Sequence, residues 1–312
     1  MATSECASSC IGGTPINRVL YNPFGQSRGK LPHRQPRRDY EVDCDRGCNI
    51  SFMNHYTPLS ENTRVLLLGS LLGDGSLKIH PLYKNARFSF RHSHAQQHYF
   101  MWKVAQLEEI SSDKCMWQQT KNGSDGWGTV KWRYQSMALP ALTELFNLTH
   151  HHGKFLIRRK WLNLLTPLSL AIWWQDDGSI IANGRKGVLC TEGFTQPEVQ
   201  LLRQYLKAVW HIETVVAPKS AREPSKVRLW FRSSEQLQSF MRIIMPHIAV
   251  EQMIPKFILL YHNHQLQQRW ISEVARLSRF PLSAVEKHFQ QKKERWKEYR
   301  NASENDIVQP LR

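Results

Sequence analysis

The sequence predicts an α+β protein in which one unit, ordered helix, hairpin, helix, hairpin, helix, occurs twice. Segments with helical spacing of apolar residues alternate with segments that switch between apolar and polar at every residue, which is the strand pattern. The same order of segments returns about 100 residues further along the chain. Each copy also opens with an apolar helix that ends in aspartate and glycine. These observations predict two subdomains of the same architecture.

The first copy begins with an apolar helix expected over Arg64–Gly73. A strand is expected over Ala86–His92 and a helix over Gln97–Ile110, where helical spacing returns. A strand over Gly126–Tyr134 and a helix over Pro140–Leu148 complete this copy.

The second copy follows the same order. Its apolar helix is expected over Leu168–Asp176, and a strand follows over Gly187–Glu192. Next come a helix over Gln196–Trp210, an alternating strand over Lys226–Arg232 and a closing helix over Glu235–Ile244. The agreement in order between the copies is the main support for a duplicated fold.

Extensions flank the two copies, which we place at residues 59–160 and 161–260. Residues 1–58 are rich in proline and basic residues and have no helical or strand period, so they predict an irregular basic extension. The same composition is typical of an organellar transit peptide, with a remnant of fused coding sequence or a solvated basic arm as alternatives. Residues 261–312 contain Arg269–Arg300, whose charge spacing predicts a basic helical extension.

The charge of the chain points to a polyanionic partner. Its 312 residues include 42 Lys and Arg against 26 Asp and Glu, a formal net charge of +16. Hydrophobic residues make up 41% of the chain, which excludes wholesale disorder. Nucleic acid is therefore the expected partner. No apolar run approaches the roughly 20 residues that cross a bilayer, so no membrane partner is expected.

The six cysteines are few for this length and predict a reducing compartment rather than a disulfide scaffold. Four of them form two pairs with three-residue spacers, Cys6 with Cys10 and Cys44 with Cys48. Four thiolates could complete a tetrahedral zinc site. Because no helix or strand pattern supports these pairs, ordinary free cysteines are the favoured interpretation.

Three histidines, His92, His94 and His98, lie where the first expected strand passes into a helix. They could ligate a transition metal. Their place at this passage favours polar residues at the surface or facing DNA instead.

Each apolar helix ends in a carboxylate, Asp74 in the run Leu67–Gly75 and Asp177 in the run Leu170–Gly178. The helix dipole disfavours a negative charge at a C-terminus, and two such charges on paired helices would repel each other. A divalent cation removes this penalty, and carboxylate and carbonyl oxygens suit Mg²⁺. One such helix would be interpreted as an ordinary capped core helix, whereas two copies favour a metal site.

Glycines have two expected roles in these runs. Gly69 and Gly73 lie one helical turn apart, a spacing that lets two helix backbones approach closely. Gly75 and Gly178 directly follow the aspartates, where a helix commonly ends in a left-handed residue.

The two runs resemble the signature helices of the LAGLIDADG homing endonucleases, specifically the double-motif, single-chain type encoded in organellar introns. Flanking runs resemble this family as well, so that the resemblance covers about residues 60–260: Leu165–Ala171, Thr191–Thr195, Met245–His247 and Gln252–Lys256. The chain departs from the family pattern in lacking an acid before Asp74, in having Ile172 in place of glycine, and in placing Asp176 where a small residue is usual.

The resemblance implies two pseudo-symmetric αββαββα subdomains whose sheets form a DNA-binding saddle. It implies a monomer that hydrolyses both strands of a long double-stranded DNA target with Mg²⁺, for which Mn²⁺ could substitute. An organellar location, chloroplast or mitochondrion, accompanies this type of protein.

The resemblance also implies roles for particular residues. The last aspartate of each signature helix ligates metal in the family, which points to Asp74 and Asp177, with Gly73 and Asp176 as neighbouring members of the metal site. A lysine lies near each scissile phosphate in the family, and by position these are Lys154 and Lys256. The alternative for either lysine is an ordinary solvated or phosphate-contacting cation.

The alternating strands supply the expected DNA surface. One face of each strand carries apolar side chains, and the other carries basic and polar ones. A two-stranded ribbon fits the major groove, where Arg, Lys and Gln read base edges, and a solvated sheet face is the alternative. The residues expected to contact DNA are Arg87, Ser89, Arg91, Lys131, Arg133, Gln135, Arg185, Lys186, Lys226, Arg228 and Arg232.

A second function is compatible with the same fold. The chain could be a maturase that binds its host intron RNA and assists splicing without cutting DNA. The intact Asp74 and Asp177 favour cleavage over this alternative, and use as a transcription factor is a more distant third.

Overall fold

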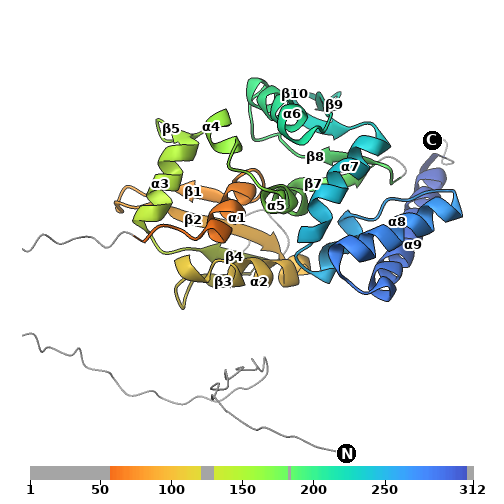
Figure 1. Ribbon diagram of the computed structural model, residues 1–312, viewed down its shortest axis with the longest axis horizontal. Coiled ribbons are helices and arrows are strands. Elements are labelled where there is room, and N and C mark those ends of the chain that lie inside the picture. The colour runs from red at the N-terminus through yellow and green to blue at the C-terminus, as the bar shows by residue number, and fades with distance from the viewer. Residues whose placement is uncertain (1–56, 121–129, 182–183, 308–312) are drawn as a thin grey trace, which may run out of the picture. The chain divides into compact units, whose positions relative to one another are not determined.

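The computed structural model describes residues 57–120, 130–181 and 184–307 (Figure 1). All but the last two residues of the predicted N-terminal extension lie outside these described residues, as do both cysteine pairs and the first part of the predicted strand Gly126–Tyr134. No helix among the described residues is both long and apolar enough to cross a membrane.

The first half contains the unit that the sequence predicts. In chain order its elements are α1 (Glu61–Leu71), β1 (Ser76–Lys78), β2 (Arg87–Ser93), α2 (Gln97–Ala105), β3 (Met116–Gln119), β4 (Lys131–Gln135) and α3 (Pro140–Thr149). The four strands form an antiparallel sheet in the order β1-β2-β4-β3. The predicted helix Gln97–Ile110 was too long, because α2 ends at Ala105 and only a short 3₁₀ turn, Glu108–Ile110, follows.

The second half repeats this order. Its elements are α5 (Pro167–Asp177), β7 (Gly178–Ile181), β8 (Lys186–Leu189), α6 (Gln196–Trp210), β9 (Val215–Ser220), β10 (Glu223–Phe231) and α7 (Ser234–Ile244). The sheet order β7-β8-β10-β9 is equivalent to that of the first half. The duplicated αββαββα fold is therefore confirmed, while the exact subdomain boundaries stay a prediction.

Shorter elements connect and extend the two halves. A hairpin of β5 (His150–His151) and β6 (Lys154–Phe155) and the short helix α4 (Arg159–Leu162) join them. Two 3₁₀ segments, η3 (Met245–His247) and η4 (Glu251–Lys256), follow α7. The C-terminal stretch is two helices rather than one, α8 (His264–Ser278) and α9 (Leu282–Ile307). They are separated at Arg279, which has a left-handed φ of 63°, and by the nearby proline.

The helices α1 and α5 lie side by side at the centre of the described structure (Figure 1). Both are buried around most of their circumference, as expected of helices that are apolar on all sides. A Cβ atom on Gly69 would lie only 2.4 Å from the carbonyl oxygen of Ser169, so a side chain at this position would push the helices apart. The Ser169 hydroxyl donates to the carbonyl of Val65, 2.7 Å away. This contact brings the ends of α1 and α5, and with them the two signature aspartates, to the same place.

The prediction of left-handed caps at Gly75 and Gly178 was wrong. Gly178 has φ −81° and ψ 145°, and Gly75 is not among the described residues with positive φ. Space explains both glycines instead. A Cβ atom on Gly75 would lie 2.8 Å from Phe88 Cε2, and one on Gly178 would lie 2.3 Å from the Trp174 ring.

Candidate metal and nucleic-acid site

The two signature aspartates lie at the joint between the halves. Asp177 is the last residue of α5, and Asp74 lies just beyond the end of α1. The backbone amide of Asp74 donates across the joint to Asp176 Oδ2, 3.4 Å away. The close packing of α1 on α5 thus places acids from both copies in one cluster.

The two aspartates differ electrostatically. Burial raises the pKa of Asp177 to about 7, helped by the negative charges of Asp74 and Asp176 and only partly opposed by Lys256. Burial also raises the pKa of Asp74, but contact with His92 and the charges of His92, Lys103 and Lys256 outweigh it and lower this pKa overall. Each nearby negative charge disfavours ionisation of Asp177, so the surroundings of Asp177 contain too little positive charge to balance the acids.

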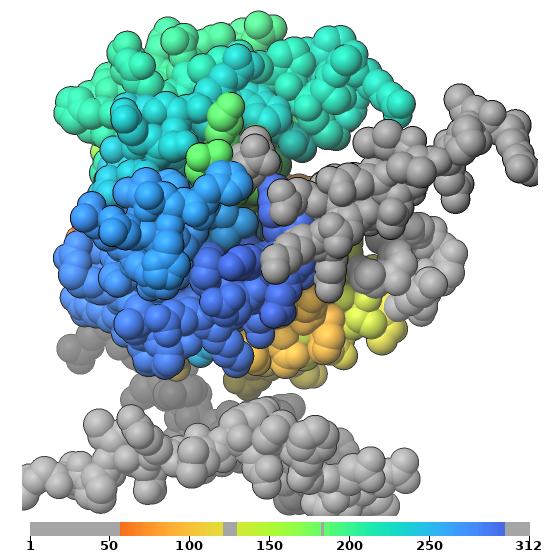
Figure 2. Space-filling view, turned by 90° about the vertical axis from the view of Figure 1, so that its right-hand side faces the viewer, coloured from red at the N-terminus to blue at the C-terminus, as the bar shows by residue number. Residues whose placement is uncertain are grey.

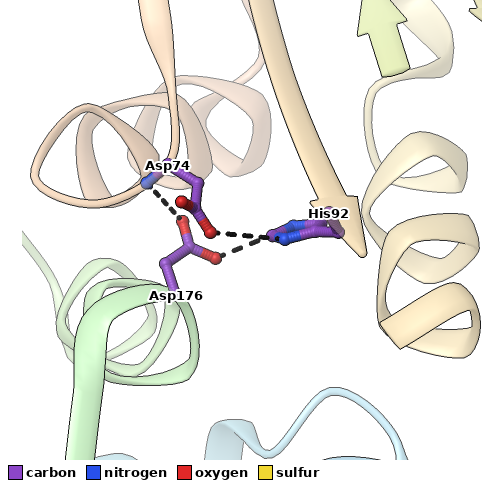
Figure 3. A group of neighbouring side chains, drawn as sticks. All are labelled: Asp74, His92 and Asp176. Carbon is purple, nitrogen blue, oxygen red and sulfur yellow. Dashed lines mark hydrogen bonds and ion pairs between the residues drawn. The ribbon is translucent and has the colours of Figure 1, made fainter. Parts of the chain in front are cut away.

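His92 faces two of the acids, Asp74 and Asp176, which lie next to each other (Figure 3). Its Nδ1 is 3.3 Å from Asp74 Oδ2, and its Nε2 is 4.0 Å from Asp176 Oδ1. The side chain is fully buried, and neither ring nitrogen makes a well-aligned hydrogen bond. The expectation that His92 lies at the surface was therefore wrong, whereas His94 and His98 are exposed as expected. The strand alternation could have revealed this, since His92 continues the inward face of Phe88 and Phe90.

Asp176 is the centre of a buried polar network that joins the halves. Lys103 Nζ, from α2, lies 2.9 and 2.8 Å from its two carboxylate oxygens. The Tyr99 hydroxyl donates to Oδ1 at 2.8 Å. Neither Lys103 nor Tyr99 was among the residues predicted from sequence. Their signal was a lysine within the apolar stripe of a helix, at i+4 from the tyrosine.

This network changes the role expected for Asp176. Ligand atoms of Asp74, His92 and Asp176 all lie within 4.8 Å of one another, which is close enough to surround an ion. However, the ammonium of Lys103 already neutralises Asp176, and the Tyr99 hydroxyl is bound to the same carboxylate. A second cation there would be repelled by Lys103, so these contacts do not favour a metal on Asp176, and its place in the metal site stays a prediction. Asp176 also leaves no room for a side chain at Gly73, because a Cβ atom there would lie 2.5 Å from the Cβ atom of Asp176.

Neither Asp74 nor Asp177 is bound to Lys103 in the way that Asp176 is. The Asp74 side chain is 37% exposed and Asp177 is partly buried, so both remain accessible from solvent. Their charges interact strongly enough for Asp74 to raise the pKa of Asp177. Oxygen-rich, partly hydrated sites with one or two carboxylates are typical of Mg²⁺.

Lys256 lies against the same cluster. Its Nζ donates to the carbonyls of Gln175 and Asp176, at 3.2 Å for the latter, at the C-terminal end of α5. A cation is favoured at this end of a helix. Burial lowers the pKa of Lys256, while Asp176, Asp177 and Asp74 oppose that shift.

Lys154, the other predicted catalytic lysine, lies elsewhere in the fold. It is exposed on β6, in the hairpin that joins the halves, and does not contribute to the pKa shifts of either signature aspartate. The lysine of the first half that reaches the acids is Lys103 instead. The structure therefore brings Lys256 into the cluster, and the role of Lys154 stays a prediction without support from these contacts.

The outer face of the first sheet opens directly beside Asp74. The alternation in β2 is as expected, with Phe88 and Phe90 buried and the intervening residues facing outward. A hollow of about 350 Å³ is lined by Asp74, Ser76, Lys78, Ser89, Phe90, Arg91, Trp117, Arg133, Tyr134 and Gln135. Four of the residues predicted to contact DNA are among them. Trp117, which is 42% exposed, was not predicted, since its short strand shows no clear alternation.

The outer face of the second sheet has a different charge arrangement. Arg228 is bound through Nε and its terminal nitrogen to Glu192, at 2.7 Å from Nε. Lys226 pairs with Glu223 at 2.9 Å. Lys186 is exposed at the start of β8, and Arg232 directly follows the end of β10. Two of the cations predicted to contact DNA are thus already paired with acids in the free protein.

This protein belongs to the class of chains that contain two αββαββα units and carry acids where the two central helices end. The same fold occurs in the solved structure of the homing endonuclease I-WcaI bound to its DNA recognition sequence. That match has a TM-score of 0.57 at 22% identity and covers 66% of this chain and 90% of the other.

Residues 64–238, more than half of the chain, match the LAGLIDADG DNA endonuclease family, and the chain belongs to this family. Among its relatives are the protein RecA of Mycobacterium shimoidei, 29% identical over 64% of this chain and 48% of the relative, and the DNA endonuclease I-ChuI of Chlamydomonas applanata, 22% identical over 53% and 80%. The cytochrome b mRNA maturase bI2 of Debaryomyces hansenii is 23% identical over 63% and 74%. The chain spans about half the length of the RecA relatives that it matches.

Proposed function

We propose that this protein is a site-specific DNA endonuclease that cuts both strands of a long target with Mg²⁺, acting as a monomer. The observation that carries the proposal is the position of Asp74. This aspartate belongs to the acid cluster at the joint of the halves and also lines the hollow formed by Arg91, Arg133 and Gln135. The relative named as a DNA endonuclease and the net charge of +16 support the proposal.

Asp74 and Asp177 would hold the metal, one for each strand. Bound Mg²⁺ supplies charge neutralisation at the phosphate and lowers the pKa of water. Mn²⁺, which prefers the same oxygen ligands, would be a substitute. Because one aspartate comes from each half, a single chain would suffice for both strands.

Lys256 would stabilise charge at the scissile phosphate. Two of its three N–H groups are used at the end of α5. Among the described residues the third has no acceptor, so it can donate to a phosphate oxygen or to a water molecule. The buried Lys103 cannot take this role, since it is bound to Asp176 on the inner side of the cluster.

The test is cleavage of a randomised double-stranded DNA library with Mg²⁺, with sequencing of the ends produced. Asp74→Asn and Asp177→Asn should each abolish double-strand cleavage. Asp113→Asn is the matched control, because Asp113 is an exposed aspartate outside the cluster. A purified wild type that binds DNA and cuts nothing in this library would refute the proposal.

Intron-RNA binding is the second candidate function, since one relative is named as a cytochrome b mRNA maturase. The same relative supports an organellar location for this chain. If the protein is a maturase, Asp74→Asn and Asp177→Asn will leave binding and splicing of the host intron RNA unchanged. Loss of RNA binding in both variants would argue against a role independent of the acid cluster.

A further inference from the structure

Lys256 is the last residue of the 3₁₀ segment η4, and the residues directly after it have no regular hydrogen-bonded structure of their own. Phe257, Ile258 and Leu259 follow η4 as irregular backbone, and all three are completely buried. Buried backbone carbonyls must find hydrogen-bond donors, because an unsatisfied one costs about 1–3 kcal/mol. The donors to this segment therefore decide where Lys256 lies.

Five consecutive carbonyls, those of residues 255–259, each accept a hydrogen bond from a side chain. Trp174 of α5 donates to the carbonyl of Lys256 itself, at 3.0 Å. The other four carbonyls are bound by the C-terminal helices α8 and α9. This pair of helices lies beyond the region that matches the family, which ends at residue 238. Figure 2 shows the pair, in blue, directly against the second half.

Lys292 of α9 makes two of these four hydrogen bonds. Its Nζ donates to the carbonyls of Pro255 and Ile258, each at 2.7 Å, so it bridges the two residues that flank the Lys256–Phe257 pair. From α8, Trp270 Nε1 donates to the carbonyl of Phe257 at 3.0 Å, and Gln267 Nε2 donates to that of Leu259 at 3.0 Å. The C-terminal helices thus determine the path of the chain on both sides of Lys256.

Burying the lysine at position 292 is energetically unfavourable compared with burying an apolar side chain. Burial disfavours the charged form of Lys292 and lowers its pKa to about 7. An apolar side chain of similar length would avoid this penalty but would leave two carbonyls without a donor. The hydrogen bonds to the Lys256 segment are therefore the specific contribution of this ammonium.

We propose that Lys292 is a positioning residue, which fixes Lys256 against the acidic helix ends by binding the carbonyls of Pro255 and Ile258. The C-terminal helices then belong to the support of the active centre rather than to an independent accessory. This inference rests on the proposed function, in which Lys256 acts at the scissile phosphate. It assigns no direct contact with DNA to Lys292.

The test compares Lys292→Met with Lys293→Met in the full chain. Lys293 is the neighbouring residue on α9, but it is exposed and lies over the Phe289 ring. Lys292→Met should slow single-turnover cleavage about 10–100-fold, the effect of misplacing a catalytic group by about 1 Å. DNA affinity should stay within about threefold of wild type. Lys293→Met should leave the cleavage rate unchanged.

A double-variant cycle separates positioning from general stability. In the Lys256→Met background, Lys292→Met should have no further effect on the cleavage rate, because it acts only through Lys256. Equal losses of rate in both backgrounds would overturn the proposal. So would a Lys292→Met variant that cleaves as fast as wild type.

Hydrogen–deuterium exchange supplies a readout that does not need cleavage. A peptide covering residues 255–261 should exchange faster in Lys292→Met than in Lys293→Met. If wild type cleaves nothing, the proposed function fails while this exchange result still decides whether Lys292 holds the segment. Should Lys292→Met fail to fold, Trp270→Phe removes the donor to the carbonyl of Phe257 while keeping an aromatic ring, and it should give the same result to a smaller extent.

Discussion

Asp74 and Asp177 occupy equivalent places in the repeated unit, yet their surroundings differ. The first half provides His92 and Lys103 near its aspartate, and these lower the pKa of Asp74. The second half provides Asp176 instead, which adds a negative charge and helps to raise the pKa of Asp177 to about 7. The two copies of the fold therefore differ in the charges around their aspartates, and the residue before each aspartate differs as well, Gly73 in the first half and Asp176 in the second.

The largest expected effect comes from removing the cation that compensates Asp176. Lys103→Met would leave a buried carboxylate without its ion pair, and we expect a loss of about 3–5 kcal/mol in the free energy of unfolding. The measurement is urea unfolding at neutral pH, with the exposed Lys114→Met as control. The double variant Lys103→Met, Asp176→Ala should be more stable than Lys103→Met alone. If both unfold alike, the pair does not stabilise the joint.

The same substitution at the two aspartates should change stability in opposite directions at pH 8 without metal. The pKa of Asp177 is raised from 3.8 to about 7, so the folded state binds more protons than the unfolded state between these values, and stability falls as pH rises across this window. Asp177→Asn removes the cost of ionising this buried carboxyl and should stabilise the protein by about 2 kcal/mol. This is less than the free energy that corresponds to the full pKa shift, because the side chain is partly exposed.

Asp74→Asn should instead destabilise the protein at pH 8. Its lowered pKa means that the ionised carboxylate stabilises the folded state above the ordinary pKa of 3.8, and that this contribution is lost as pH falls through the lowered value. Thermal unfolding of both variants from about pH 2 to pH 8, in EDTA, covers the titration of both aspartates and measures the two effects. A change of the same sign in both variants would contradict the electrostatic difference between the halves.

Addition of Mg²⁺ should reduce the difference between the halves. An ion bound near Asp177 in the second half supplies the positive charge that this side lacks. Binding stabilises the folded state by about 1.4 kcal/mol when free Mg²⁺ exceeds its dissociation constant tenfold. We expect this gain in wild type and a smaller one in Asp177→Asn, measured as the shift in unfolding midpoint between EDTA and Mg²⁺. An equal gain in both would place the ion elsewhere.

Much of this architecture could be predicted because it depends on local patterns. The alternation in β2 and β10 and the apolar helices α1 and α5 were visible in the sequence, and α6 was predicted with its exact bounds, Gln196–Trp210. The short strands β1, β3, β7 and β9 were not, since three to six residues carry too little alternation and their pairing depends on distant partners.

The acid cluster was only half predictable for a similar reason. Asp74 and Asp177 could be found because each ends a repeated helix. Lys103 stands out as a lysine in the apolar stripe of a helix, but its pairing with Asp176, 73 residues away, depends on how the two halves pack and has no local signal. The hydrogen bonds of Lys292 to the Lys256 segment arise in the same way, from the packing of α9 on η4.

The smallest expected effects concern the two DNA faces. Arg91 is exposed in the hollow beside Asp74, whereas Arg228 is neutralised by Glu192. Arg91→Met should weaken DNA binding by about 1 kcal/mol and reduce the slope of log affinity against log salt by about one. Glu192→Gln should strengthen DNA binding and make this slope steeper, because it frees the guanidinium of Arg228 for a phosphate. Affinity titrations at several salt concentrations measure both slopes, and a Glu192→Gln slope no steeper than wild type would show that Arg228 does not face the DNA.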